Sequence, residues 1–211
     1  MTVPGRRESA ALLLSLDPPP WFVHHARAVA EVAAWLARRS VAAGVEVDGA
    51  LVEAAALLHD VDKIVTVAGA GGRALPHGDG SAAWLRRGGW EELAPAVAWH
   101  AVTRLADRAA ADTLLAAPDE VRIVAYADKR AGQRLESMDA RFASWARRYP
   151  VAPGDRAAAE RLRQMRSGAA ALEDAVCARA RVRPTDVRRL PWTGRALAAA
   201  LGQGAAGEVR R

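Results

Sequence analysis

Apolar residues recur every three to four positions along most of this chain, and this spacing constrains its fold more than any other feature. A helix is expected over residues 21–39, where Val29, Val32 and Leu36 fall on one face. Strand-like alternation is weak, and the nearest candidate, residues 64–67, is too short to form a sheet alone. We therefore predict an all-α fold, in which alanine-rich helices pack closely as a bundle.

Residues that begin and end helices divide the rest of the pattern. Asp48 is a typical N-cap, so a helix is expected from it to about Lys63. Pro118 and the two acids after it begin another helix, which ends near Asp128. The other expected helices cover residues 78–87, residues 90–105, a long segment after residue 155, and residues 184–190.

A stripe of large side chains lies near residue 145. Met138, Phe142, Trp145 and Tyr149 follow one another at positions i, i+4, i+7 and i+11, which is the spacing of one helix face. Large apolar residues at this spacing most often pack into a core. We therefore interpret the stripe as core packing and not as a cofactor-binding motif.

A segment rich in proline and glycine, residues 150–155, is the clearest linker in the chain. It separates a main helical domain, residues 1–150, from a C-terminal helical extension, residues 151–192. Residues 193–211 consist mostly of small residues with a charged end, so we expect a flexible tail there.

Composition excludes several classes of protein. The single cysteine, Cys177, excludes a disulfide framework and a zinc site built on several thiolates, so we expect a cytoplasmic protein. The apolar run near the N-terminus stops at three prolines, and no segment is long enough to span a membrane. The formal net charge is +6, but the 30 Lys and Arg residues are spread along the chain. This distribution favours an anionic small molecule over nucleic acid as a partner, or it reflects mere composition.

The placement of histidine and aspartate is the most informative chemical feature. Four of the five histidines and two aspartates are distributed over different expected elements, so converging helices could bring them to one centre. Imidazole and carboxylate together suit iron, manganese, cobalt, nickel or zinc better than calcium. The candidate metal ligands are His25, His59, Asp60, His77, His100 and Asp128.

A metal site is not the only interpretation of these residues. A histidine near a helix end is commonly a capped or solvated side chain, and an isolated His-Asp pair does not decide the question. Consecutive residues on a helix point about 100° apart, so His59 and Asp60 could serve one ion from two sides or bridge two ions. The same geometry places His25 on the inward face with Val29, so we assign His25 as the ligand in preference to His24.

Lysine occurs only at Lys63 and Lys129, and each flanks a candidate ligand. Lys63 lies three residues after Asp60, on the same side of the expected helix. A flexible ammonium group there could contact the phosphate oxygens of a metal-bound substrate. Asp62 could orient Lys63 or transfer a proton, or it could be a solvated surface acid.

These motifs, in this order, resemble the HD superfamily of metal-dependent phosphohydrolases, whose helical core carries an H…HD…D signature. The segment HARAVAE from His25 resembles the first-helix motif, HDVDK from His59 the defining doublet, and Asp128 in YADKR the final aspartate. His77 and His100 lie where members with two metals have two additional histidines. The main domain is thereby identified as a suspected HD domain.

The resemblance implies two divalent ions (Fe, Mn, Co, Ni, Zn or Mg) and hydrolysis of a phosphomonoester or phosphoanhydride by metal-activated water. The expected substrate is a nucleotide or dinucleotide, and the chain lacks the GYP element that marks cyclic-di-GMP hydrolases of this superfamily. Asp60 and Lys63 would be catalytic. The residues expected to bind the substrate phosphate are Lys63, Arg27, Lys129 and Arg130.

Two other functions remain open at this level. A few members of the superfamily use a mixed-valent di-iron site with nearly the same ligands for oxygenation. A non-catalytic HD module could instead bind nucleic acid with its arginine-rich surface, although such a module would be expected to lose some of the ligands. The sequence is also compatible with a homo-oligomer.

Overall fold

A computed structural model describes residues 3–208, and the side chains of these residues except at position 70 and from position 201 onward. It confirms the all-α prediction, because the described residues form helices and turns with only isolated bridges at Ala68–Ala74 and Ala131–Leu135. None of the described helices is both long and apolar enough to cross a membrane. The α-helices are α1 (Arg6–Leu14), α2 (Pro20–Ala42), α3 (Gly49–Leu58), α4 (Asp79–Arg87), α5 (Ala94–Ala98), α6 (Arg108–Leu115), α7 (Asp119–Arg130), α8 (Met138–Arg148), α9 (Arg156–Ala180) and α10 (Thr193–Glu208).

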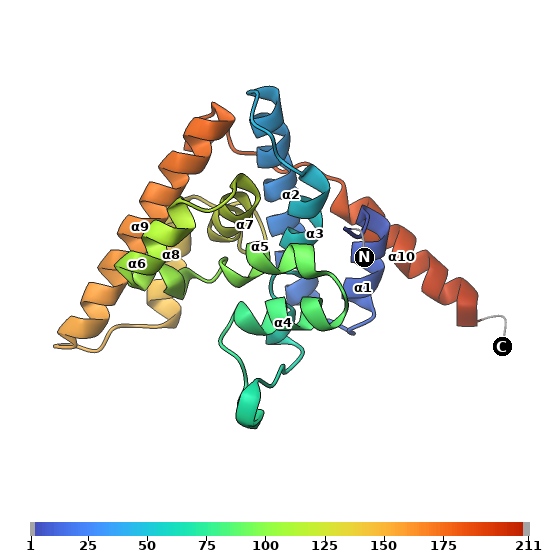
Figure 1. Cartoon of the computed structure of the whole chain (residues 1–211), viewed down its shortest axis with the longest axis horizontal. Coiled ribbons are helices and arrows are strands. Elements are labelled where there is room, and N and C mark those ends of the chain that lie inside the picture. The colour runs from blue at the N-terminus through green and yellow to red at the C-terminus, as the bar shows by residue number, and fades with distance from the viewer. Residues whose placement is uncertain (1–2, 209–211) are drawn as a thin grey trace.

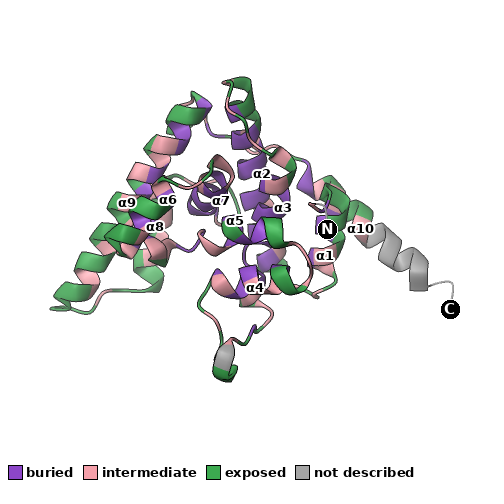
Figure 2. Cartoon of the chain, in the orientation of Figure 1, coloured by how far each residue is buried: buried purple, intermediate pink, exposed green. Residues whose placement is uncertain are grey.

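Helices α2, α3 and α7 form the centre of the molecule, where burial is nearly continuous (Figure 2). Alanines such as Ala30, Ala33 and Ala55 are fully buried on these helices. Because an alanine side chain is short, the helix backbones can approach closely and leave little unfilled volume. This rigid centre holds the ends of three helices, and the candidate site is built at those ends.

The helix expected from Asp48 to Lys63 is shorter in the structure. Asp48 is the N-cap as predicted, and its carboxylate accepts hydrogen bonds from the backbone of the first turn. Helix α3 ends at Leu58, and a 3₁₀ turn, η1 (Val61–Lys63), follows. Asp60 lies between them at φ −106°, ψ 13°, in the sparsely populated region where many active-site residues are found.

The single helix predicted over residues 90–105 is wrong. The segment is divided into the 3₁₀ turn η3 (Glu91–Leu93), helix α5 and the 3₁₀ turn η4 (Val102–Ala106). His100 lies in the break between α5 and η4. The extended backbone of Ala101, at ψ 129°, ends the helical run and turns the chain toward α9.

The C-terminal helices flank the centre on two sides (Figure 1). The linker expected at residues 150–155 is present, and the long helix after it is α9, which packs on α7 and η4. The short helix expected over residues 184–190 is a single 3₁₀ turn, η5 (Pro184–Asp186). On the other side, α10 packs against α1.

Residues 193–208, which belong to the segment predicted to be a flexible tail, form helix α10, and the flexibility of this segment stays a prediction. Trp192 and Leu197 are buried at its start and supply the apolar contact that the small residues around them lack. Residues 209–211 lie outside the described part of the chain. The division into a domain of residues 1–150 and an extension of residues 151–192 stays a prediction.

The prediction of core packing for the stripe on α8 is confirmed for Phe142, which belongs to the buried core, and for Met138 and Trp145, which pack against that core, but not for Tyr149. Phe142 is buried, but Trp145 is only half-buried and Tyr149 is 68% exposed. These three side chains also line a cleft between α8 and α9. The stripe has the predicted helical spacing, and its exposed end, Tyr149, borders the cleft that α9 lines from the other side.

Candidate metal centre

Six side chains from five parts of the chain meet at the inner ends of α2, α3 and α7. His59, Asp60 and His100 are fully buried, and His25 and Asp128 are nearly so. The contributing segments are α2 (His25), the end of α3 (His59 and Asp60), the turn before α4 (His77), the break after α5 (His100) and α7 (Asp128). The six predicted metal ligands are therefore neighbours in the structure.

One half of this cluster lies between α2, α3 and α7. His25 Nε2 is 3.1 Å from Asp60 Oδ2 and 3.4 Å from Asp128 Oδ1. His59 Nε2 is 3.4 Å from the same Asp60 oxygen, and the two Nε2 atoms are 3.2 Å apart. Ligand atoms of His25, His59 and Asp128 all lie within 4.8 Å of one another, so they could hold one metal ion.

The other half uses the second oxygen of the same aspartate. His100 Nε2 lies 3.1 Å and His77 Nε2 lies 3.3 Å from Asp60 Oδ1, and these two Nε2 atoms are 3.1 Å apart. The two Asp60 oxygens therefore face two different pairs of histidines. A carboxylate in this position can bridge two ions.

All four histidines of the cluster use Nδ1 for a hydrogen bond to a protein oxygen. Three of these oxygens are backbone carbonyls, which only accept, so Nδ1 carries a proton and Nε2 is the nitrogen that faces the aspartates and is available to a metal ion. This arrangement is typical of metal-binding histidines, because the outer hydrogen bond fixes both the tautomer and the ring. The pairs are His25 with Gly132 O (2.8 Å), His59 with Ala56 O (2.8 Å), His100 with Val97 O (2.5 Å) and His77 with Asp62 Oδ1 (2.9 Å).

Without a cation the cluster must attract protons. Burial alone would lower the pKa of His59, but Asp60 and Asp128 raise it to about 10. Burial likewise opposes ionisation of both aspartates, yet the surrounding histidines hold the pKa of each carboxyl well below its usual range. By contrast, burial dominates at His100 and lowers its pKa. Carboxylates next to bare imidazole nitrogens are the donor set that a divalent cation would neutralise.

Asp62 is a positioning residue and not a surface acid. Its side chain is 7% exposed, and Oδ2 accepts a hydrogen bond of 2.7 Å from the backbone of Gly78. Burial opposes ionisation, but hydrogen bonds from His77, Gly78 and Ser81 outweigh it and lower the pKa of Asp62. The carboxylate therefore orients the His77 ring, as in other carboxylate–histidine pairs at metal sites.

Glycine is required where His77 enters α4. Gly78 has φ +88°, and a Cβ there would lie 2.9 Å from the carbonyl oxygen of Ala98. Side chains are disfavoured by both the positive φ and the close backbone. Gly78 thus lets the turn that carries His77 lie directly on α5.

Lys63 lies at the mouth of the cluster. Its Nζ is 2.6 Å from Asp60 Oδ2, and its side chain remains 41% exposed. Burial would lower the pKa of Lys63, but Asp60 and Asp128 raise it above the usual value. A charged, partly exposed ammonium therefore borders the cleft that leads to the cluster.

Two of the residues predicted to bind phosphate, Lys129 and Arg130, are buried and do not line the cleft. Lys129 is fully buried, and its ammonium donates hydrogen bonds to the backbone carbonyls of His100 (2.6 Å) and Ala125 (3.0 Å). Arg130 is 5% exposed, and its guanidinium bonds Glu136 O, Tyr126, Glu173 and Pro184 O. Both side chains hold the scaffold together behind the site.

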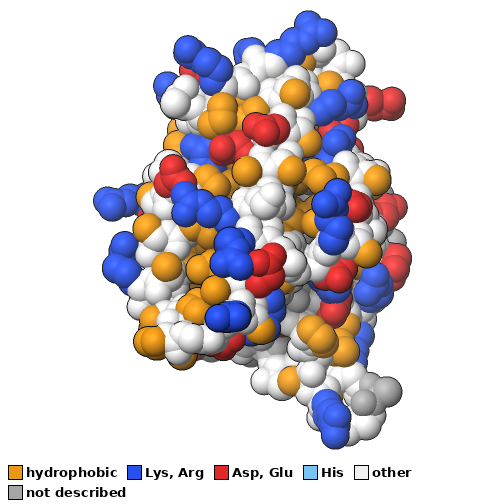
Figure 3. All heavy atoms as spheres, turned by 90° about the vertical axis from the view of Figure 1, so that its left-hand side faces the viewer, with side chains coloured by type: hydrophobic (Ala, Val, Ile, Leu, Met, Phe, Trp, Pro, Cys, Tyr) orange, Lys and Arg blue, Asp and Glu red, His pale blue; other side chains and the backbone are white. Residues whose placement is uncertain are grey.

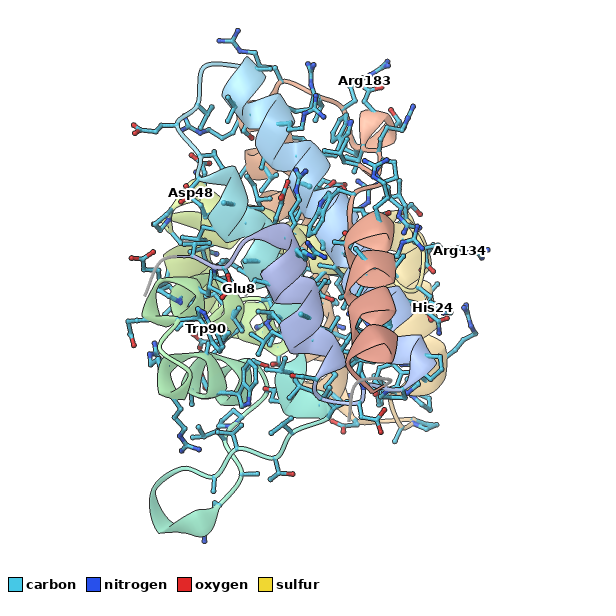
Figure 4. The ribbon with its side chains drawn as sticks, turned by 90° about the vertical axis from the view of Figure 1, so that its right-hand side faces the viewer. Glu8, His24, Asp48, Trp90, Arg134 and Arg183 are labelled. Atoms are coloured by element: carbon cyan, nitrogen blue, oxygen red, sulfur yellow. The ribbon has the colours of Figure 1, made fainter. Side chains whose placement is uncertain are left out.

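Arg27, the third of these residues, lies on another face of α2. Its Nε is 3.0 Å from Glu31 Oε1, and its guanidinium lies against Gly194 at the start of α10. Two helical positions separate it from His25, which is about 200° of rotation. Arg27 does not line the cleft. His24, the alternative first ligand, is exposed at the molecular surface (Figure 4).

A cleft of about 1080 Å³ opens from the cluster toward the C-terminal helices. His25, His77 and Asp128 lie at its inner end, and α8 and α9 form its outer walls. Sequence reasoning missed four arginines that line it: Arg134, Arg141, Arg148 and Arg161. The signal that could have found two of them is the spacing of Arg141 and Arg148 with Trp145 on one face of α8.

Comparison with known proteins supports one assignment. The sequence model of the HD domain matches residues 22–132, which is more than half of the chain and includes all six clustered side chains. Searches of curated proteins and of solved structures found no match. The resemblance read from the motifs is confirmed at the level of the family, and the chain belongs to the HD-domain superfamily of metal-dependent hydrolases.

Proposed function

We propose that this protein is a metal-dependent phosphohydrolase that cleaves a phosphomonoester or phosphoanhydride bond. The observation that carries the proposal is the convergence of four histidine Nε2 atoms on the two oxygens of Asp60, with Asp128 beside them. In the described part of the chain, the side chain of Asp60 contacts only the four histidines and one other hydrogen-bond donor, the ammonium of Lys63. A buried carboxylate so surrounded requires a cation or protons.

Two ions fit this donor set. The first would be held by His25, His59, Asp128 and Asp60 Oδ2, and the second by His77, His100 and Asp60 Oδ1. The ligand types suit Fe, Mn, Co, Ni or Zn, and Mg²⁺ is a further candidate because of the carboxylates.

When bound, such ions lower the pKa of a coordinated water and so supply a hydroxide nucleophile near neutral pH. The residues of the chain provide the setting for the reaction. Lys63 is close enough to Asp60 to bind a phosphoryl oxygen and offset the negative charge that develops there. Asp62 and Lys129 hold His77 and His100 in place, and the burial of His59 and Asp60 excludes bulk water.

The proposed substrate is a phosphorylated small molecule, with a nucleotide or dinucleotide as the leading class. A cleft of about 1080 Å³ is large enough for such a molecule. Nucleic acid is disfavoured, since arginines on the α9 side alternate with acids and apolar groups and form no continuous basic band (Figure 3). We also keep the cytoplasmic location as part of the proposal.

Phosphate release from a panel of nucleotides and dinucleotides, after loading with each candidate metal, tests this function. We expect turnover that is independent of oxygen, is lost with a chelator, and falls at least tenfold in Lys63→Ala. Arg27→Ala is the matched control, because that residue pairs with Glu31 away from the cleft. Metal-dependent consumption of oxygen with no phosphate release would instead identify an oxygenase and contradict the proposal.

A further inference from the structure

The outer half of the cleft is built from residues beyond the part of the chain that matches the HD domain. The match ends at Gly132, whereas α8, the linker and the first half of α9 form the outer walls. These segments bring aromatic rings and arginines within reach of one another. The composition of this wall differs from both the apolar core and the remaining surface.

Arg141 is the central residue of this wall. Its guanidinium lies 4.8 Å from the ring centre of Trp145, and Nη1 would be 3.2 Å from a Cβ on Gly132, whose carbonyl holds His25. It therefore lies next to the metal centre. Its Nε is buried without a hydrogen-bond partner, and Arg141 forms no ion pair with any residue that the structure describes. The carboxylate of Glu136 also lies near Gly132, with Oε1 2.8 Å from the same Cβ position, but it forms no ion pair with Arg141 in the described part of the chain. A guanidinium that stacks on a ring and has an unsatisfied Nε donor is suited to receive an anion.

The other arginines of the wall are also without acidic partners. Arg134, Arg148 and Arg161 line the cleft and form no ion pair in the described part of the chain. On the outer side of α9, by contrast, Arg163 pairs with Glu160 and Arg166 with Asp139. The acids in the outer cleft are Glu136 and Asp155, and Asp155 already caps α9. The outer cleft thus carries an excess of positive charge.

Aromatic rings accompany this charge. Trp21 and Tyr149 are 47% and 68% exposed, and they are two of the three large apolar side chains classed as exposed among the described residues. Both line the cleft, together with the half-buried Trp145. Exposed aromatic rings grouped in a hollow are typical of ligand sites, where a flat ring can stack on them.

We propose that the outer cleft is a recognition subsite for a substrate that carries a second anionic group and an aromatic ring system. Arg141 binds the phosphate that follows the one at the metal centre, and the ring stacks against Trp145 and Tyr149. A nucleotide with more than one phosphate is the simplest molecule of this class. The inference rests on the proposed function, which places one phosphate of the substrate at the metal centre. The residues of the subsite are not metal ligands, so they can be tested separately.

Binding of two hydrolysis-resistant probes to the metal-loaded protein tests the subsite without requiring turnover. The first probe is the β,γ-methylene analogue of ATP, which carries phosphates and a base, and the second is methylenediphosphonate, which carries the charge alone. We expect Arg141→Gln to weaken the binding of both probes roughly tenfold or more in equilibrium dialysis. Arg147→Gln is the matched control, since Arg147 is exposed on the same helix and does not line the cleft.

Tyr149→Ala distinguishes the contribution of ring stacking from that of charge. Because Tyr149 is exposed, we expect this variant to fold normally. We expect it to weaken the ATP analogue about fivefold or more and to leave methylenediphosphonate unchanged. Equal effects of Arg141→Gln and Arg147→Gln, or equal binding of both probes to the unaltered protein, would overturn the proposal. Phosphate release without these binding effects would refute the subsite alone, whereas binding without phosphate release would refute the proposed function alone.

Discussion

The buried ammonium of Lys129 donates a hydrogen bond of 2.6 Å to the backbone carbonyl of His100. Lys129 follows Asp128 on α7, and His100 lies in the break between α5 and η4. The contact therefore ties the segment that carries one half of the cluster to the helix that carries the other. It also explains why a lysine stands at a position where no solvent reaches the side chain.

Removing this hydrogen bond should weaken metal binding in the half of the cluster that contains His77 and His100. We expect Lys129→Met to lower the affinity of the second ion roughly 10- to 100-fold, because the partners that orient metal ligands have effects of this size. Calorimetric titration with the metal ion measures the affinities of the two ions separately. Arg108→Met, at a residue that is 90% exposed, is the control for the loss of charge. Two unchanged affinities in Lys129→Met would show that the contact has no role in the site.

Metal binding should release protons, and the pH dependence follows from the cluster. In the metal-free protein the pKa of His59 is raised to about 10, so its ring is protonated at neutral pH and must lose that proton to become a ligand. The pKa of His100 is lowered, so this ring is already neutral. We therefore expect metal affinity to rise with pH until the pH reaches the His59 pKa of about 10.

Calorimetric titration in two buffers that differ in ionisation enthalpy counts the released protons. We expect more protons from the half that contains His25 and His59, whose pKa values are both raised, than from the half that contains His100. Metal affinity that is independent of pH, with no proton release, would contradict this description of the cluster.

The turn before α4 offers a matched pair of glycine substitutions. Gly78 and Gly44 have nearly equal positive φ values, +88° and +86°, but only Gly78 has a backbone oxygen within reach of a new Cβ. Gly44→Ala should therefore cost about 1 kcal/mol of unfolding free energy from backbone strain alone. Gly78→Ala should cost more, because of the contact with Ala98, and should also displace His77.

Urea unfolding and metal content distinguish the two effects in these variants. We expect both alanine variants to lose stability but only Gly78→Ala to lose bound metal. If Gly44→Ala lost as much metal as Gly78→Ala, general destabilisation would explain the result and the local role of Gly78 would be refuted.

The six clustered residues could be predicted from the sequence mainly because their motifs occur in the order typical of HD proteins, since the residues alone left capped or solvated histidines as an alternative. Asp48 begins α3 and Pro118 begins α7, so the positions of His59 and Asp128 on their helices followed from capping and length. The breaks after Leu58 and around His100 were not predictable. They depend on contacts such as that with Lys129, which join segments far apart in the chain.

The phosphate-binding residues were harder to predict because closeness in sequence is a poor guide to direction. Arg27 and Arg130 flank ligands, but each points to another face of its helix. Arg141 lies thirteen residues after Asp128, the last ligand, and lines the cleft because α8 and α9 form its outer walls. The same arrangement exposes Tyr149, whose spacing had suggested a core position.

The metal content of the purified protein and of Asp60→Ala tests the central claim most directly. Asp60 contributes one oxygen to each half of the cluster, so its loss should affect both ions at once. Asp112→Ala, on the exposed face of α6, is the matched control. We predict about two divalent ions per chain in the unaltered protein and in Asp112→Ala, and close to none in Asp60→Ala, with helical circular dichroism retained in all three. An Asp60→Ala protein that still holds two ions and hydrolyses its substrate would contradict the account.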